Sequence, residues 1–232
     1  MKELKFIHIA KCAGTSIENA GMKLGLHWGL NQKEYYINSA GNSDWWRVRP
    51  LRWWHTIPSC ISPELIERYD WFTVVRNPYD RILSEYYCKW GGLGSKAAAH
   101  TAEQMNTYLI NQINTRNPDG AHYTEQHLYL IPDIHIVHFE NLVTELNRLM
   151  ELYSIKGLVL DKDNRSVPKK HTVKDFSDEL ICLINRVYAR DFELFNYPLI
   201  EPIKLDTPPS TEVELGLNIG SGLVTADCDA TV

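Results

Sequence analysis

Two stretches of the chain share one local pattern, a short apolar strand that passes through a turn into the start of a helix. The first is residues 6–21, FIHIAKCAGTSIENAG, and the second is residues 70–87, DWFTVVRNPYDRILSEYY. The run from Trp71 to Val75 is apolar and β-branched, as is typical of a buried parallel strand. Pro78 cannot continue a strand and is well placed at a helix start. The pattern therefore predicts an α/β fold built on a mainly parallel sheet.

The turn of the first stretch has the composition of an anion site. Lys11 and Gly14 stand in the turn, and Thr15 and Ser16 lead into the helix. Free backbone N–H groups at a helix N-terminus, the helix dipole, a lysine and two hydroxyls favour a phosphate-like group, and glycine lets the main chain approach it. The turn is not a Walker A sequence, because Lys11 precedes the glycine and no Gly-Lys-Ser/Thr follows. The alternative is an ordinary strand-to-helix turn with a solvated lysine.

The second stretch places two further anion ligands near the same edge of such a sheet. Arg76 follows the strand directly, and Ser84 lies two turns later on the next helix. Both side chains can reach an anion that lies outside the carboxyl ends of the strands. The alternatives are a surface ion pair for Arg76 and a solvent-facing helix position for Ser84.

The segments FIHIAKCAGTSI and TVVRNPYDRILSEYY resemble the two phosphosulfate-binding signatures of sulfotransferases that use 3′-phosphoadenosine-5′-phosphosulfate (PAPS). The likeness is strongest to the branch of Golgi-type carbohydrate sulfotransferases, although Ala10 stands where proline is common. The resemblance implies a P-loop-like fold of three layers, a 5′-phosphosulfate on the first segment and a 3′-phosphate on the second. It assigns the donor to Lys11, Cys12, Ala13, Gly14, Thr15, Ser16, Arg76 and Ser84.

The reaction that the resemblance implies is in-line transfer of the sulfuryl group from PAPS to a hydroxyl or amine of a carbohydrate or small-molecule acceptor, leaving adenosine-3′,5′-bisphosphate. Lys11 would offset the charge that builds on the leaving oxygen. Two alternatives remain open. A P-loop-type kinase would need a magnesium-binding acid, and a non-catalytic nucleotide-binding protein would lack a competent base.

His55 is the candidate base for the acceptor hydroxyl. Imidazole titrates in the range that proton transfer requires. His55 precedes an Ile-Pro turn, and many members of the resembled branch place a histidine in a similar phrase at a similar distance before the second motif. The alternatives are a histidine that packs beside Trp54 and a different base, Glu125, because some family members use a glutamate.

The acceptor and donor have further candidate contacts outside the two motifs. Tryptophans such as Trp53 and Trp54 alternate with arginines in residues 27–60, where they can stack on sugars or form a small core of their own. Gln126, beside Glu125, resembles a family residue near the active cleft. A basic loop that contains Arg165 and Lys169 resembles a family loop that closes near the cofactor, although a solvated charge run is its alternative.

Composition and charge set the domain organisation. We expect a single sulfotransferase domain over residues 1–200, with residues 27–60 as an acceptor-side insertion, and a flexible acidic tail over residues 201–232. The tail carries six acids and one base, so the other 200 residues hold 23 acids and 23 bases. This neutral body argues against nucleic acid as a partner.

No window of the sequence has the apolar length of a transmembrane helix, and the start is charged, so we expect neither a signal peptide nor a membrane partner. This differs from the membrane-anchored Golgi members. Five cysteines without a Cys-x-x-Cys pair fit reduced thiols, and we expect a cytoplasmic enzyme of unspecified oligomeric state. His135 and His138 fall on opposite sides of a predicted strand, no other cluster has metal-ligand spacing, and we predict no metal.

Overall fold

The computed structural model describes residues 1–26, 28, 55, 57–60, 63–116, 122–161 and 169–202. These residues belong to one compact unit, Met1–Pro202. Its strands and α-helices are, in chain order, β1 (Leu4–Ile7), α1 (Gly14–Lys23), α3 (Pro63–Arg68), β2 (Asp70–Val75), α4 (Pro78–Tyr86), α5 (Ala102–Asn114), β3 (His135–His138), α6 (Leu142–Leu152), α7 (Asp178–Val187) and α8 (Ala189–Leu194). Short 3-10 helices are η3 (Pro58–Cys60), η4 (Gly94–Ala99), η5 (Gln126–Tyr129), η6 (Phe139–Asn141) and η7 (Val173–Asp175).

The three strands form one parallel sheet in the order β1-β2-β3. Ile7 on β1 lies opposite Thr73 on β2, and Val75 on β2 lies opposite His138 on β3. The buried Thr73 hydroxyl also donates to the Ile7 carbonyl at 2.8 Å. This sheet, flanked by helices, confirms the predicted α/β fold. Since all three strands point the same way, the segments that leave their carboxyl ends emerge at one edge.

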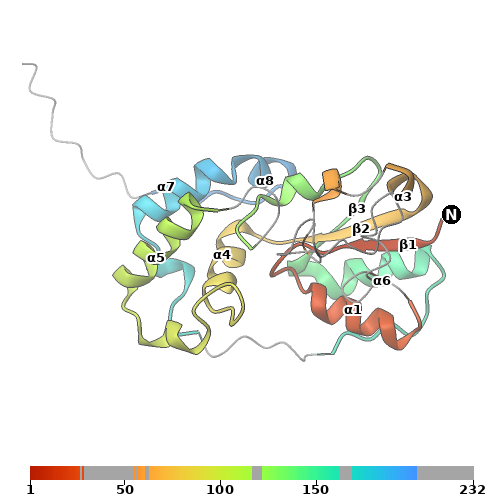
Figure 1. The fold of residues 1–232 in the computed structure, drawn as a ribbon, viewed down its shortest axis with the longest axis horizontal. Helices are drawn as coiled ribbons and strands as arrows, with labels where there is room; N and C mark the ends of the chain where they lie inside the picture. The colour runs from red at the N-terminus through yellow and green to blue at the C-terminus, as the bar shows by residue number, and fades with distance from the viewer. Residues whose placement is uncertain are drawn as a thin grey trace, which may run out of the picture. The chain divides into compact units, whose positions relative to one another are not determined.

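Figure 1 shows α1 and α6 along one face of the sheet and α3 on the other. The central strand is the most deeply buried, with Phe72, Val74 and Val75 fully inaccessible to solvent. Trp28 packs edge-to-face on Phe72 and donates its indole N–H to the Leu4 carbonyl at 3.0 Å. This one described tryptophan of the aromatic segment therefore belongs to the main core.

A second apolar core joins α4 to α5, α7 and α8. Helix α4 begins at Pro78, where the side chain of Asn77 accepts a hydrogen bond from the Tyr79 N–H at 3.0 Å. Helices α7 and α8 follow each other directly along the chain. Tyr188 lies at the junction, and its buried hydroxyl donates to the Tyr123 carbonyl at 2.7 Å.

Some of the sequence predictions concern residues outside the described part of the chain. These are most of the insertion over residues 27–60, including Trp53 and Trp54, together with Arg165 and the tail from residue 203 onward. Among the described residues, no helix has the length and apolar character needed to cross a membrane.

The hydrogen bond between β1 and β2 gives a first prediction. Thr73→Val keeps the shape of the side chain but removes the donor to the Ile7 carbonyl, so we expect the free energy of unfolding to fall by about 1 kcal/mol in urea denaturation. The same substitution at Thr144, which is exposed on α6, should have a smaller effect. Equal changes at both positions would show that this hydrogen bond does not stabilise the strand pair.

Candidate active site

The turn between β1 and α1 has an unusual backbone. Lys11 and Ala13 both adopt the left-handed conformation, with φ of 67° and 63°, although neither is glycine. Ala13 is the N-cap of α1 and makes no side-chain cap, and the first turn of the helix contains no acidic residue. The first N–H groups of a helix have no partners within the helix, and strained backbone of this kind is concentrated at binding sites. The turn thus offers uncapped donors at a positive helix end, as an anion requires.

Arg76, at the end of β2, contacts this turn directly. Its Nη1 donates to the Lys11 carbonyl at 3.2 Å, and its guanidinium lies 4.1 Å from the centre of the Phe139 ring. Its Nε atom is buried and has no hydrogen-bond partner among the described residues. A buried donor on a cation that lacks an acceptor is costly unless a ligand supplies one. The two motifs of the sequence are therefore in contact. At this contact the Arg76 Nε–H is available to donate to an anion.

Lys169 adds a third positive charge to the same place. Its side chain is exposed, yet partial desolvation of the ammonium group and then the charges of Arg76 and Lys11 lower its pKa, against the opposite effect of Asp80. Repulsion among three cations is relieved when an anion binds between them. The cations thus fit a ligand with several negative charges.

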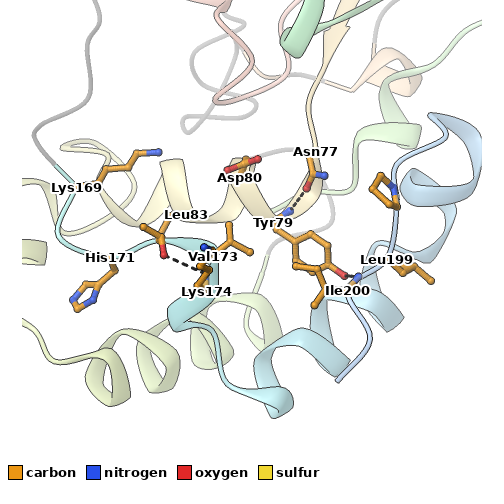
Figure 2. Close-up of a pocket in the computed structure, with 12 residues that line it drawn as sticks. Asn77, Tyr79, Asp80, Leu83, Lys169, His171, Val173, Lys174, Leu199 and Ile200 are labelled. Carbon is orange, nitrogen blue, oxygen red and sulfur yellow. Dashed lines mark hydrogen bonds between the residues drawn. The ribbon is translucent and has the colours of Figure 1, made fainter. Parts of the chain in front are cut away.

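Ser84 is buried on α4, the helix that follows Arg76. On this helix Asp80 and Leu83 line a pocket of about 490 Å³, to which Lys169 also belongs (Figure 2). The complete lining is Asn77, Tyr79, Asp80, Leu83, Lys169, His171, Thr172, Val173, Lys174, Pro198, Leu199 and Ile200. Lys169 therefore connects the cation cluster at the turn with a pocket along α4.

Gln126 holds Arg76 in place instead of pointing toward an acceptor. Its side chain accepts from the Arg76 N–H at 2.9 Å and donates to the Arg76 carbonyl at 2.8 Å. The Cys12 thiol lies 3.5 Å from the same amide oxygen, and burial raises the pKa of Cys12 to about 12. The thiol of Cys12 therefore stays protonated and packs inside the protein, so only its backbone can serve the anion site. The predicted acceptor contact at Gln126 becomes a brace between the two motifs.

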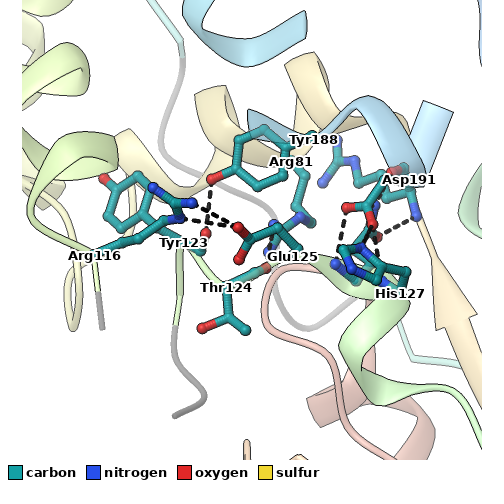
Figure 3. Close-up of polar contacts among 10 residues, drawn as sticks. Arg81, Arg116, Tyr123, Thr124, Glu125, His127, Tyr188 and Asp191 are labelled. Atoms are coloured by element: carbon teal, nitrogen blue, oxygen red, sulfur yellow. Dashed lines mark hydrogen bonds and ion pairs between the residues drawn. The ribbon is translucent and has the colours of Figure 1, made fainter. Parts of the chain in front are cut away.

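Figure 3 shows how the segment before and after Gln126 is anchored. The fully buried Arg81 donates to the carbonyls of His122 and Thr124 at 3.1 and 2.7 Å. Asp191 accepts from the backbone N–H groups of Gln126 and His127, each at 2.8 Å. Side chains from α4 and α8 thus fix the backbone that carries Gln126.

Glu125, the rival base, is engaged in this network. Its carboxylate forms an ion pair with Arg116 at 2.6 Å, and the side chain is largely buried. The Glu125 carboxylate is therefore already occupied by an ion pair with Arg116.

His55 has a hydrogen bond that fixes the tautomer of its neutral imidazole. Its Nδ1 lies 3.1 Å from the His8 carbonyl, which can only accept, so Nδ1 carries the proton and Nε2 carries the lone pair. Burial, followed by the charges of His8 and His122, holds the pKa of His55 well below its usual range. His55 is therefore neutral at neutral pH.

Sequence reasoning gave no role to His8 or Glu18. His8 contacts His55 directly, and Glu18 holds the His8 side chain. His8 Nδ1 lies 3.0 Å from Glu18 Oε1, and the rings of His8 and His55 meet edge-to-face with centroids 4.5 Å apart. A Cβ atom on Gly14 would lie 2.1 Å from His8 Nε2. Gly14 is therefore needed for the close approach of His8, in addition to the predicted approach of an anion. The only sequence signal for this contact is that His8 lies within the first motif.

Comparison with known proteins identifies the family. A model of the sulfotransferase family matches residues 2–198. The chain therefore belongs to the sulfotransferase family, and the general reaction of this family is transfer of a sulfuryl group. The match does not favour the alternative of a P-loop-type kinase. Comparisons with curated proteins and with solved structures gave no match.

The contact between Gly14 and His8 gives a second prediction. Gly14→Ala should lower the free energy of unfolding by about 1 to 3 kcal/mol, because the added methyl overpacks the His8 ring. In a His8→Ala background the same substitution should cost much less, since the colliding ring is absent. Urea denaturation of the four proteins of this cycle measures the difference.

Gly21→Ala provides the matched control for this cycle. It lies in the same helix, but its methyl would meet Trp28, 2.7 Å away, and not His8. Removal of the His8 ring should therefore leave the cost of Gly21→Ala unchanged. Equal costs of Gly14→Ala in both backgrounds would contradict the assigned contact.

Proposed function

We propose that the protein is a PAPS-dependent sulfotransferase of the carbohydrate branch that sulfates a hydroxyl or amine of a carbohydrate or small-molecule acceptor. The observation that supports this proposal most directly is the contact of Arg76 with the Lys11 turn, where a buried guanidinium donor has no partner among the described residues. The three described thiols Cys12, Cys88 and Cys182 are free, which agrees with a reducing compartment such as the cytoplasm.

The cations and donors of the site fit the two charged ends of this donor. Lys11, Thr15, Ser16 and the N–H groups at the start of α1 would hold the 5′-phosphosulfate. A second group of residues, Arg76, Ser84 and Lys169, would hold the 3′-phosphate, together with Arg165 from the family resemblance. PAPS supplies the activated sulfuryl group when bound.

Within this scheme His55 removes the proton of the acceptor hydroxyl. Its Nε2 carries the lone pair, and the His8 carbonyl fixes the ring by binding Nδ1. Glu18 in turn holds the His8 side chain. Lys11 stabilises the negative charge that develops on the leaving side, a task for which a fixed cation near a helix N-terminus is suited.

A third prediction concerns the nucleotide. Adenosine-3′,5′-bisphosphate should bind more tightly than ATP in isothermal titration calorimetry, and Arg76→Ala should weaken it by about 10- to 100-fold through loss of charge-assisted hydrogen bonds. Arg76→Lys should recover only part of the affinity, because lysine keeps the charge but lacks the planar fork of donors.

Arg148→Ala is the matched control for Arg76→Ala, since Arg148 is exposed on α6. It should leave the affinity for the bisphosphate unchanged. If wild type prefers ATP, or if Arg76→Ala binds the bisphosphate normally, the donor assignment is wrong.

A fourth prediction separates the base from the donor site. His55→Ala should lower the transfer rate from radiolabelled PAPS by about 100- to 10000-fold, as expected for loss of a general base, with little change in bisphosphate affinity. The assay uses an acceptor found by screening sugars and phenols with wild type. Glu125→Gln should retain most of the activity. The reverse order of activities would transfer the role of base to Glu125.

A further inference from the structure

Glu85, Cys88 and His122 form a cluster that the transfer mechanism does not use. Glu85 is on the last turn of α4, Cys88 follows the helix, and His122 lies on the segment anchored by Arg81. One ligand atom from each of the three, an oxygen, a sulfur and a nitrogen, lies within 4.8 Å of the other two. All three types of atom are common zinc ligands.

The carboxylate of Glu85 is incompletely satisfied. Glu85 is fully buried, its Oε2 lies 2.7 Å from His122 Nδ1, and its Oε1 is buried without a hydrogen-bond partner among the described residues. A Cβ atom on Gly91 would lie 2.2 Å from Oε1, so this oxygen packs closely against the chain at Gly91. A buried carboxylate oxygen without a donor is expensive, and a cation is one way to satisfy it.

We propose that Glu85, Cys88 and His122 bind one zinc ion. A thiolate, a carboxylate and a neutral imidazole together carry two negative charges, so Zn²⁺ makes the buried site neutral. The mixture of sulfur, nitrogen and oxygen suits zinc better than magnesium or calcium, which prefer oxygen alone. Three protein ligands leave the fourth tetrahedral position for water.

The surroundings of the cluster hold its ligands in place. Arg81 donates to the His122 carbonyl at 3.1 Å, which fixes the segment that carries the imidazole. The His122 ring also meets the His55 ring edge-to-face, with centroids 5.2 Å apart. Zinc at this position therefore adjoins the proposed base, but its binding does not depend on sulfuryl transfer.

The test measures binding of zinc to the full-length chain after treatment with EDTA. Competition with a chromophoric chelator should show one zinc ion per chain. Cys88→Ser and His122→Asn should each lower the affinity by about 100-fold or more, beyond the 10- to 100-fold typical of residues outside the first ligand sphere. Cobalt(II) should give a sulfur-to-metal charge-transfer band that Cys88→Ser abolishes.

Cys182→Ser is the matched control, because Cys182 is a free cysteine exposed on α7. It should keep both the zinc affinity and the cobalt band. An alkylation experiment on the wild-type protein tests the proposal even if a cluster variant fails to fold. Zinc should slow the alkylation of Cys88 by iodoacetamide but leave the alkylation rate of Cys182 unchanged. Mass spectrometry measures both rates. Absence of zinc binding, a cobalt band that survives Cys88→Ser, or alkylation of Cys88 at the same rate with zinc would each overturn the proposal.

Discussion

The parallel pairing of β1 with β2 is the constraint on which the rest of the structure depends. With Ile7 opposite Thr73, the segments that leave the two strands emerge side by side, and the Arg76 guanidinium reaches the Lys11 carbonyl. Strands of opposite direction would have sent these segments to opposite edges of the sheet. The anion site is thus a consequence of strand direction and register, to which the left-handed turn adds uncapped N–H groups.

A buried polar network gives this site its rigidity. Gln126 pairs with both backbone groups of Arg76, and the segment around it is held by Arg81 and Asp191. Such a network in a low-dielectric interior is strong when its members are satisfied and costly when one is removed. The brace explains why these polar groups are fully buried beside the candidate anion site.

Charge is divided between two neighbouring regions. Lys11, Arg76 and Lys169 form one group that suits a polyanion, whereas the Glu85 carboxylate and the Cys88 thiol form another that suits a cation. The ring of His122, a member of the second group, contacts the ring of His55 edge-to-face. Burial, followed by the charges of His8 and His122, keeps His55 neutral. The charge of each group is thus opposite in sign to the charge of its proposed ligand.

The sequence by itself determined the α/β class, the positions of β1, β2 and the helices after them, and the meeting of Lys11 with Arg76. These follow from local periodicity, from Pro78, and from the rule that parallel strands end at one edge. Only the tertiary structure decided that Gln126 braces Arg76, that Gly14 makes room for His8, and that Cys88 lies beside His122. Such contacts join segments far apart along the chain and are fixed by side-chain packing. Local sequence patterns therefore cannot predict them.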